Sequence, residues 1–192
     1  MITYRFCETL TDSDAPAWEK LTHTELGESV HAKRKQGFQL AREALRLALR
    51  ERGIEAPIEE LKLNRFDSLV HFPDFTLSLS HTPKLGAAIL GARNLYRSLG
   101  IDIEDKNRQV KEMIIERIAH PEDLGLRNLE LWCLKEAAFK AAMNTGLFDK
   151  PIEFSSLRIQ DQTWSHSPSN LTGEWRLEEY KDHLVALAWI KN

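Results

Sequence analysis

The chain has 192 residues, a formal net charge of −3 and a calculated isoelectric point near 6.2. A dedicated nucleic-acid-binding protein carries a strongly basic surface, so this charge balance argues against that class. With 42% hydrophobic residues, the chain has enough apolar content for one domain or for two small, closely packed lobes.

Short chemical motifs exclude several common enzyme classes. The sequence contains no His-Glu-x-x-His, no phosphate-binding glycine loop and no Gly-x-Ser-x-Gly elbow, so zinc hydrolases, common nucleoside triphosphatases and serine hydrolases lack local support. Cys7 and Cys133 lack metal or redox spacing, which favours a reduced, cytoplasmic protein. We see neither a signal peptide nor an apolar run of membrane-spanning length, and we expect no membrane association.

The first half of the chain predicts strands around one long helix. Apolar residues at helical spacing predict a helix over 29–52, which Gly53 ends. Strict alternation predicts a strand over 75–81, and a turn at Pro83 leads into a second strand over 86–91. This half also contains a predicted strand over 2–7, an acidic turn over 11–16 and a short strand over 61–63.

The second half repeats the order of a long helix followed by strands. Alternation predicts a strand over 99–104, and helical periodicity predicts helices over 110–119 and 127–143. Further strands are predicted over 154–160, 174–180 and 184–190, with a polar loop over 165–173. The expected fold class is therefore α+β. We expect two similar lobes, 1–98 and 99–192, each with a long helix on a small antiparallel sheet and with a ligand cleft between them.

Carboxylates and lysines form the most informative cluster. Asp102 and Glu104 are two residues apart on a predicted strand, so their like charges share one side and need solvent or a divalent cation. On the predicted helix, Glu136 and Lys140 are one turn apart, with Lys135 beside them. A solvated surface explains most such pairs. Three carboxylates with two lysines instead favour Mg²⁺ and a phosphate ligand.

A basic helix and a strand end are weaker candidates. Lys33, Arg34, Lys35 and Arg42 either solvate a helix face, hold a phosphate or dock an acidic partner. His81 follows a hydroxyl residue at a predicted strand end, where ligands are often bound, although a lone histidine is more often structural.

Three blocks together carry a family resemblance. They are Ser-Leu-Ser-His-Thr at 78–82, Gly-Ile-Asp-Ile-Glu at 100–104, and Trp-x-x-Lys-Glu-x-x-x-Lys at 132–140. A looser fourth block runs from Lys33-Arg34 to Ala41-Arg42. Their order and separation resemble the 4'-phosphopantetheinyl transferases of the larger, monomeric, surfactin-synthetase-activating type. The resemblance implies two α+β lobes related by a pseudo-twofold axis, with coenzyme A and Mg²⁺ in the cleft.

The resemblance also implies roles for individual residues. Asp102, Glu104 and Glu136 match the metal-binding carboxylates. The positions that match contacts to coenzyme A are Lys135 and Lys140 at its phosphates, His81 at the 3'-phosphate with Ser80 and Thr82 beside it, and Arg34 and Arg42 around the nucleotide.

The implied reaction moves 4'-phosphopantetheine from coenzyme A to a serine of an apo acyl or peptidyl carrier protein and releases 3',5'-ADP. Asp102, Glu136 and Lys140 are the expected catalytic residues, and Glu136 is the expected base, directly or through a water bound to the metal. Metal and lysines would lower the pKa of Glu136. Such enzymes serve fatty-acid, polyketide or nonribosomal peptide synthesis.

Two alternatives remain open from the sequence. A non-catalytic module that binds coenzyme A or a carrier protein would keep the basic residues without needing three carboxylates. A different Mg²⁺-dependent phosphotransferase would be expected to show a phosphate loop. We expect a monomer with an acidic carrier protein as its partner, and neither nucleic acid nor membrane.

Overall fold

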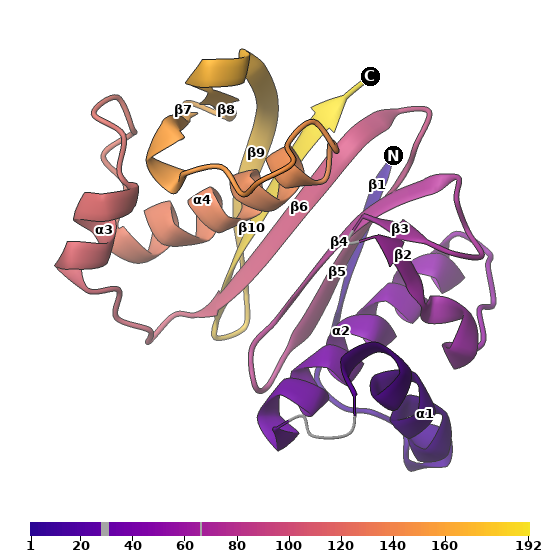
Figure 1. Cartoon of the computed structure of the whole chain (residues 1–192). Helices are drawn as coiled ribbons and strands as arrows, with labels where there is room; N and C mark the ends of the chain where they lie inside the picture. Colours follow the sequence, from indigo (N-terminus) through magenta and orange to yellow (C-terminus); the bar gives the residue numbers. More distant parts are fainter. Residues whose placement is uncertain (28–30, 66) are drawn as a thin grey trace. The chain divides into compact units, whose positions relative to one another are not determined.

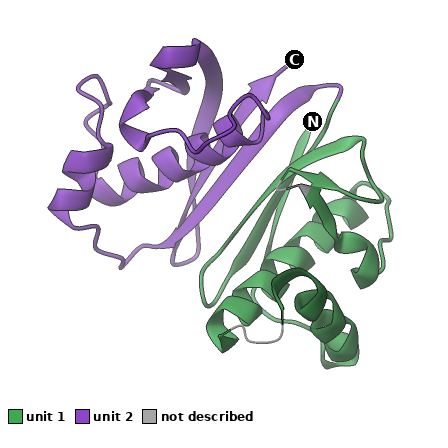
Figure 2. Ribbon diagram, in the orientation of Figure 1, with its two compact units in different colours: residues 1–93 green, residues 94–192 purple. Residues whose placement is uncertain are grey.

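The computed structural model describes residues 1–27, 31–65 and 67–192, so Ser29 and Val30 of the predicted long helix lie outside the described residues. The chain divides into two compact units, Met1–Arg93 and Asn94–Asn192 (Figure 2). The predicted lobe boundary, between residues 98 and 99, falls inside a strand of the second unit. Among the helices in the described ranges, none combines the length and apolar character that a bilayer span requires.

Unit 1 is a helix-covered antiparallel sheet (Figure 1). Its sheet has the order β1-β5-β4, and α2 packs on it through buried residues such as Leu45 and Leu49. A separate ribbon pairs β2 with β3. The elements are β1 (Ile2–Cys7), α1 (Ala15–Leu26), α2 (Ala32–Glu51), β2 (Leu63–Arg65), β3 (Ser68–Leu69), β4 (Phe75–His81) and β5 (Gly86–Ala92), with 3-10 helices at Asp12–Asp14 and Ile58–Leu61.

Helix α1 was not predicted from the sequence. Pro16 lies in its first turn, where proline is tolerated, and Gly27 ends it with a φ of +84°. Only one short apolar stripe marks the helix, and its buried members are Trp18 and Leu21. Two apolar positions do not establish a helical period, and we interpreted the start of the segment only as an acidic turn.

Unit 2 is a larger sheet with α4 packed against it (Figure 1). The sheet is antiparallel with the order β6-β10-β9-β8-β7, and α3 packs beside α4. Both units therefore confirm the α+β class. The elements are β6 (Tyr96–Asp105), α3 (Glu112–Ile118), α4 (Asn128–Met143), β7 (Leu157–Gln160), β8 (Thr163–His166), β9 (Leu171–Tyr180) and β10 (His183–Lys191), with 3-10 helices at Phe154–Ser156 and Ser167–Ser169.

The predicted polar loop over 165–173 is wrong. Strand β8 occupies its start and β9 begins at Leu171, with Asn170 in the left-handed conformation between them. Trp164 is fully buried on β8 and pairs with Gly173 of β9, so the segment contributes to the core despite its polar composition. The predicted strand over 154–160 starts three residues late, because Phe154–Ser156 forms a 3-10 helix.

Glycines set the closest helix–sheet contacts in both units. A Cβ atom on Gly86 of β5 would overlap the backbone of Leu40 and Ala41 in α2. A Cβ atom on Gly100 of β6 would overlap the carbonyl oxygen of Ala137 in α4 and lie 2.7 Å from the amide nitrogen of Ala141. Each long helix thus lies nearer to its strand than any residue with a side chain would permit.

Candidate active site

The close approach of α4 to β6 assembles the predicted carboxylate cluster. Gly100 faces α4, and because side chains two apart on a strand point to the same side, Asp102 and Glu104 face α4 as well. Glu136 and Lys140 are one turn apart on that helix. The structure therefore brings together four residues that were predicted from separate sequence blocks.

Lys140 is bound to the middle of β6. Its Nζ donates to Asp102 Oδ1 at 2.8 Å and to the carbonyl oxygen of Ile101 at 2.9 Å. The Lys140 side chain remains 27% exposed, while Asp102 is buried. Lys140 therefore neutralises a buried carboxylate and stays accessible to an anionic ligand.

Glu104 is held by two neighbours. The indole Nε1 of Trp132 donates to Glu104 Oε1 at 2.8 Å, and Arg108 forms an ion pair with the same carboxylate. The Arg108 guanidinium also lies 5.0 Å from the centroid of the Trp132 ring, a cation–π geometry. Sequence reasoning gave Arg108 no role, because Glu104 lies on a strand and Arg108 follows the next turn, so no regular spacing relates the two residues.

The surroundings of Glu136 within the chain raise the pKa of its carboxyl. Burial raises the pKa of this carboxyl above its ordinary value of 4.5, and the negative charges of Asp102 and Glu104 raise it further, against the opposing effect of Lys140. The predicted lowering assumed a bound metal and two flanking lysines. One of those lysines, Lys135, points elsewhere.

Lys135 lies in a buried position with internal partners, and its contact with coenzyme A phosphates stays a prediction. Its side chain is 0% exposed, and Nζ forms an ion pair with Asp123 at 2.8 Å. The same ammonium donates to the carbonyl oxygens of Phe154, at 3.4 Å, and Leu157. Burial lowers the pKa of Lys135, against the raising effect of Asp123. All three of its N–H groups are thus used inside unit 2.

The donor chemistry of the cluster suits a hard divalent cation, because Mg²⁺ prefers carboxylate oxygens. In the side-chain arrangement of the described residues, however, no group of three or more His, Cys, Asp or Glu residues is placed to hold a metal ion. Asp102 is engaged by Lys140, and Glu104 by Trp132 and Arg108. Magnesium binding at Asp102, Glu104 and Glu136 therefore stays a prediction.

Three of the predicted nucleotide-binding residues, Ser80, His81 and Thr82, lie at the end of β4 and in the turn after it. Thr82 shapes that turn, because its Oγ1 accepts from the amide of Leu85 at 3.1 Å and its amide donates to Leu85 O at 2.8 Å. Ser80 is buried on β4, and His81 is exposed at the strand end. The His81 ring lies directly against Gly37 of α2.

Arg42 has an internal partner, which argues against its predicted contact with the nucleotide. Its buried guanidinium forms an ion pair with Glu25 of α1 at 2.6 Å and lies 4.5 Å from the centroid of the Phe38 ring. Glu25 also accepts from the amide of Leu63. Arg42 therefore joins α2 to α1. Arg34, in the first turn of α2, is exposed as a ligand contact requires.

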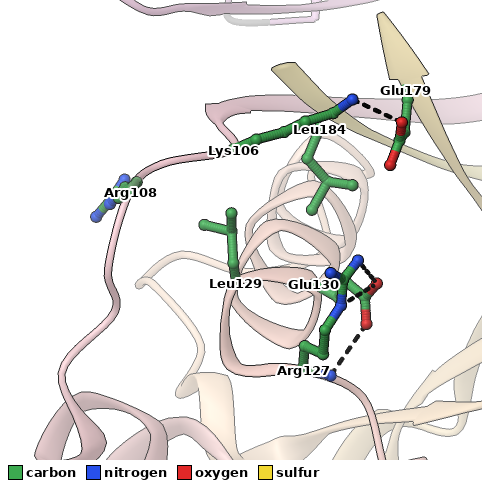
Figure 3. A pocket seen from close by; sticks show the side chains of 7 residues that line it. All are labelled: Lys106, Arg108, Arg127, Leu129, Glu130, Glu179 and Leu184. Carbon is green, nitrogen blue, oxygen red and sulfur yellow. Dashed lines mark hydrogen bonds and ion pairs between the residues drawn. The ribbon is translucent and has the colours of Figure 1, made fainter. Parts of the chain in front are cut away.

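A pocket of about 150 Å³ lies at the N-terminal end of α4 (Figure 3). Figure 3 shows Lys106 paired with Glu179, Arg127 paired with Glu130, and Arg108 at the rim. The remaining lining residues are Leu129 and Leu184. Since Arg108 also contacts Glu104, this partly basic pocket adjoins the carboxylate cluster.

Comparison with known proteins gave one family. A model described as the 4'-phosphopantetheinyl transferase superfamily matches residues 98–188, just under half of the chain. The matched segment lies in unit 2 and contains Asp102, Glu104, Glu136 and Lys140, so it supports this superfamily and a transferase activity in general. No curated protein matched the chain significantly.

Proposed function

We propose that the chain is a 4'-phosphopantetheinyl transferase, which moves phosphopantetheine from coenzyme A to a serine of an apo acyl or peptidyl carrier protein. The observation that carries the proposal is the packing of Glu136 and Lys140 of α4 against Asp102 and Glu104 of β6, within the segment that matches the superfamily. Three carboxylates beside an accessible lysine suit the transfer of a phosphate-linked group.

Glu136 is the proposed base. Removing the proton of the carrier serine improves its oxygen as a nucleophile toward the β-phosphorus of coenzyme A, and general-base assistance is typically worth about 10² to 10⁴ in rate. Burial and the neighbouring carboxylates raise the pKa of Glu136, whereas a bound Mg²⁺ would lower it. The bond to the 3',5'-ADP oxygen then breaks, and phosphopantetheine remains on the serine.

Lys140 is the proposed phosphate contact. Its ammonium is held at Asp102 and Ile101 O and remains partly exposed, so it can neutralise charge that develops on the leaving 3',5'-ADP. Asp102, Glu104 and Glu136 would hold Mg²⁺, which when bound would neutralise pyrophosphate charge.

The nucleotide end of coenzyme A is proposed to bind at unit 1. Arg34 and His81 are exposed on α2 and at the end of β4, where their charge and hydrogen-bonding atoms are accessible to phosphate. Lys33 adds a further positive charge beside Arg34. The proposal includes a monomeric enzyme of the larger type and an acidic carrier protein as its partner. Size-exclusion chromatography with light scattering tests whether the protein is a monomer.

The direct test is intact mass spectrometry of an apo carrier protein incubated with the protein, coenzyme A and Mg²⁺, with EDTA as the metal control. We expect the mass of one phosphopantetheine to be added, and EDTA to abolish the addition. Glu136→Gln should lose turnover while still binding coenzyme A, whereas Glu116→Gln, an exposed glutamate on α3, should behave as the wild type. Equal turnover of both variants would remove Glu136 from the chemistry.

Two binding experiments separate the alternatives. Stabilisation by coenzyme A without transfer to any of several carriers would support a non-catalytic coenzyme A-binding module. Stabilisation by ATP but not by coenzyme A would support a different phosphotransferase. Thermal melting distinguishes the two ligands, since a ligand that binds only the native state raises the melting temperature by mass action.

A further inference from the structure

Gly37 lies inside α2, and the helix itself does not require a glycine at this position. Gly37 is followed by fourteen further helical residues to Glu51, and glycine is unfavourable within a helix. The explanation is the imidazole of His81, which occupies the place of a side chain. A Cβ atom on Gly37 would lie 2.7 Å from both Cε1 and Cγ of His81, and closer still to Nδ1.

These contacts define the orientation of the ring. The three ring atoms nearest to the missing Cβ are Nδ1 and its two bonded neighbours. Nε2 and Cδ2 are therefore the ring atoms farther from the position of that Cβ. His81 is also exposed, so a ligand can reach the residue. A side chain at position 37 would have to displace the imidazole from this place.

A second glycine fixes the same strand end. His81 pairs with Gly86 across the β4–β5 hairpin, and Gly86 lies against the backbone of Leu40 and Ala41. On α2, these positions follow Gly37 by three and four residues, which is one helical turn. The hairpin end therefore packs against the helix at two successive turns.

The neighbouring helix turn is basic. Lys33 and Arg34 precede Gly37 by four and three residues, so they share its face of α2, and both are exposed. Helical side chains tilt toward the helix N-terminus, so the recess at Gly37 lies toward this turn. Lys33 and Arg34 therefore add positive charge to the helix face against which His81 packs.

We propose that Gly37 is a positioning residue for the phosphomonoester of coenzyme A, acting through His81. The proposal rests on the proposed function. Because position 37 has no side chain, His81 can occupy the place from which it contacts the 3'-phosphate. An alanine at this position displaces the imidazole and weakens binding of the 3'-phosphate, while the carboxylate cluster of unit 2 keeps its chemistry.

The test compares coenzyme A with 3'-dephospho-coenzyme A as ligands of wild type and Gly37→Ala. Loss of a hydrogen bond to a charged group predicts a Kd for coenzyme A that rises about 10-fold to 100-fold, with an unchanged Kd for the dephospho form. KM for coenzyme A should follow Kd, with little change in kcat. The matched control is Gln36→Ala, which makes an alanine at an exposed neighbouring position of the same helix.

A double-mutant cycle with His81→Ala isolates the contact. If Gly37 acts through His81, Gly37→Ala has no further effect on coenzyme A affinity once the imidazole is gone. The same cycle remains informative if Gly37→Ala folds poorly. In the double variant the imidazole is absent, so the overlap is removed and folding should be restored. Equal losses of affinity in both backgrounds would overturn the proposal, and so would a Gly37→Ala variant that binds coenzyme A as Gln36→Ala does.

NMR of the His81 ring separates this proposal from the proposed function. The ring resonances of the ligand-free protein should shift in Gly37→Ala and stay in place in Gln36→Ala. A wild type that does not bind coenzyme A contradicts the proposed function and with it the proposed phosphate role. Unshifted His81 resonances in Gly37→Ala contradict the positioning role alone, even in an active transferase.

Discussion

Replacing Lys135 with methionine tests whether this lysine stabilises unit 2 or binds substrate. The ammonium is fully buried against Asp123, so Lys135→Met leaves a buried carboxylate without its cation. Breaking such a pair costs about 3–5 kcal/mol. Asp123 keeps two other donors, the amides of His120 and Ile159 at 2.7 Å each, so we expect a value near the lower end, about 3 kcal/mol.

The assay is reversible urea unfolding, supported by thermal melting. A loss of about 3 kcal/mol corresponds to a fall of roughly 6–12 °C in melting temperature for a chain of this size. Lys111→Met, at an exposed position before α3, is the matched control and should change stability little. In the double variant Lys135→Met/Asp123→Asn the loss should be smaller than the sum of the single losses, because the two groups are partners.

Coenzyme A binding tests the alternative, that Lys135 contacts the substrate. Folded Lys135→Met should bind coenzyme A as the wild type does. Lys140→Met should bind it more weakly, since Lys140, unlike Lys135, is partly exposed. A Lys135→Met variant of unchanged stability with weakened coenzyme A binding would refute the structural role and restore the original prediction for this residue.

Three further predictions follow from the glutamate, a glycine and the two cysteines. Because the pKa of Glu136 is raised in the folded protein, its charge opposes folding above that raised pKa, so Glu136→Gln should increase unfolding free energy at pH 7–8. The gain should shrink as pH falls through the raised pKa and vanish below the ordinary value of 4.5, as measured by urea melts in EDTA. Gly100→Ala should lose about 1–3 kcal/mol or more through overlap with the Ala137 carbonyl. Burial raises the pKa of Cys7 to about 11 and that of Cys133 well above its ordinary range, so neither native thiol should react with Ellman's reagent at pH 8.

Each of these has a control or a contradicting result. A gain in Glu136→Gln that is the same at all pH values would show that the carboxyl charge is not its cause. Gly125→Ala is the control for Gly100→Ala, because a Cβ atom on Gly125 meets nothing within 4 Å; equal stability of the two variants would contradict the packing argument. Rapid labelling of either thiol in the native protein would contradict its burial, and both should react in urea.

The carboxylate cluster was predictable because its geometry is local. Alternation on β6 puts Asp102 and Glu104 on one side, and a single helical turn separates Glu136 from Lys140. Lys135 illustrates the limit of this reasoning. Adjacent helical residues differ by about 100° in direction, so Lys135 belongs to another face of α4 than Glu136. Its partner Asp123 lies in a loop twelve residues earlier, and no local pattern reveals that pairing.

Long-range packing also decided the elements that were missed. Strand β8 contains serines and a histidine that resemble a loop in composition, and only pairing with β7 and β9 makes it a strand. Similarly, Arg42 carries a charge that suggested a ligand, yet Glu25 of α1 neutralises it internally. For Arg42 the deciding contact comes from a helix that the sequence pattern did not predict, whereas β8 is decided by its pairing with strands that were predicted on either side of it.

The Asp123 carboxylate also has a consequence for the dynamics of unit 2. One side chain accepts from the amides of His120 and Ile159 and from Lys135, so it ties the loop after α3, strand β7 and helix α4 to a single point. Releasing any one of these segments leaves buried charge behind. The three should therefore open together, so that the His120 and Ile159 amides exchange their hydrogens with solvent as one cooperative unit.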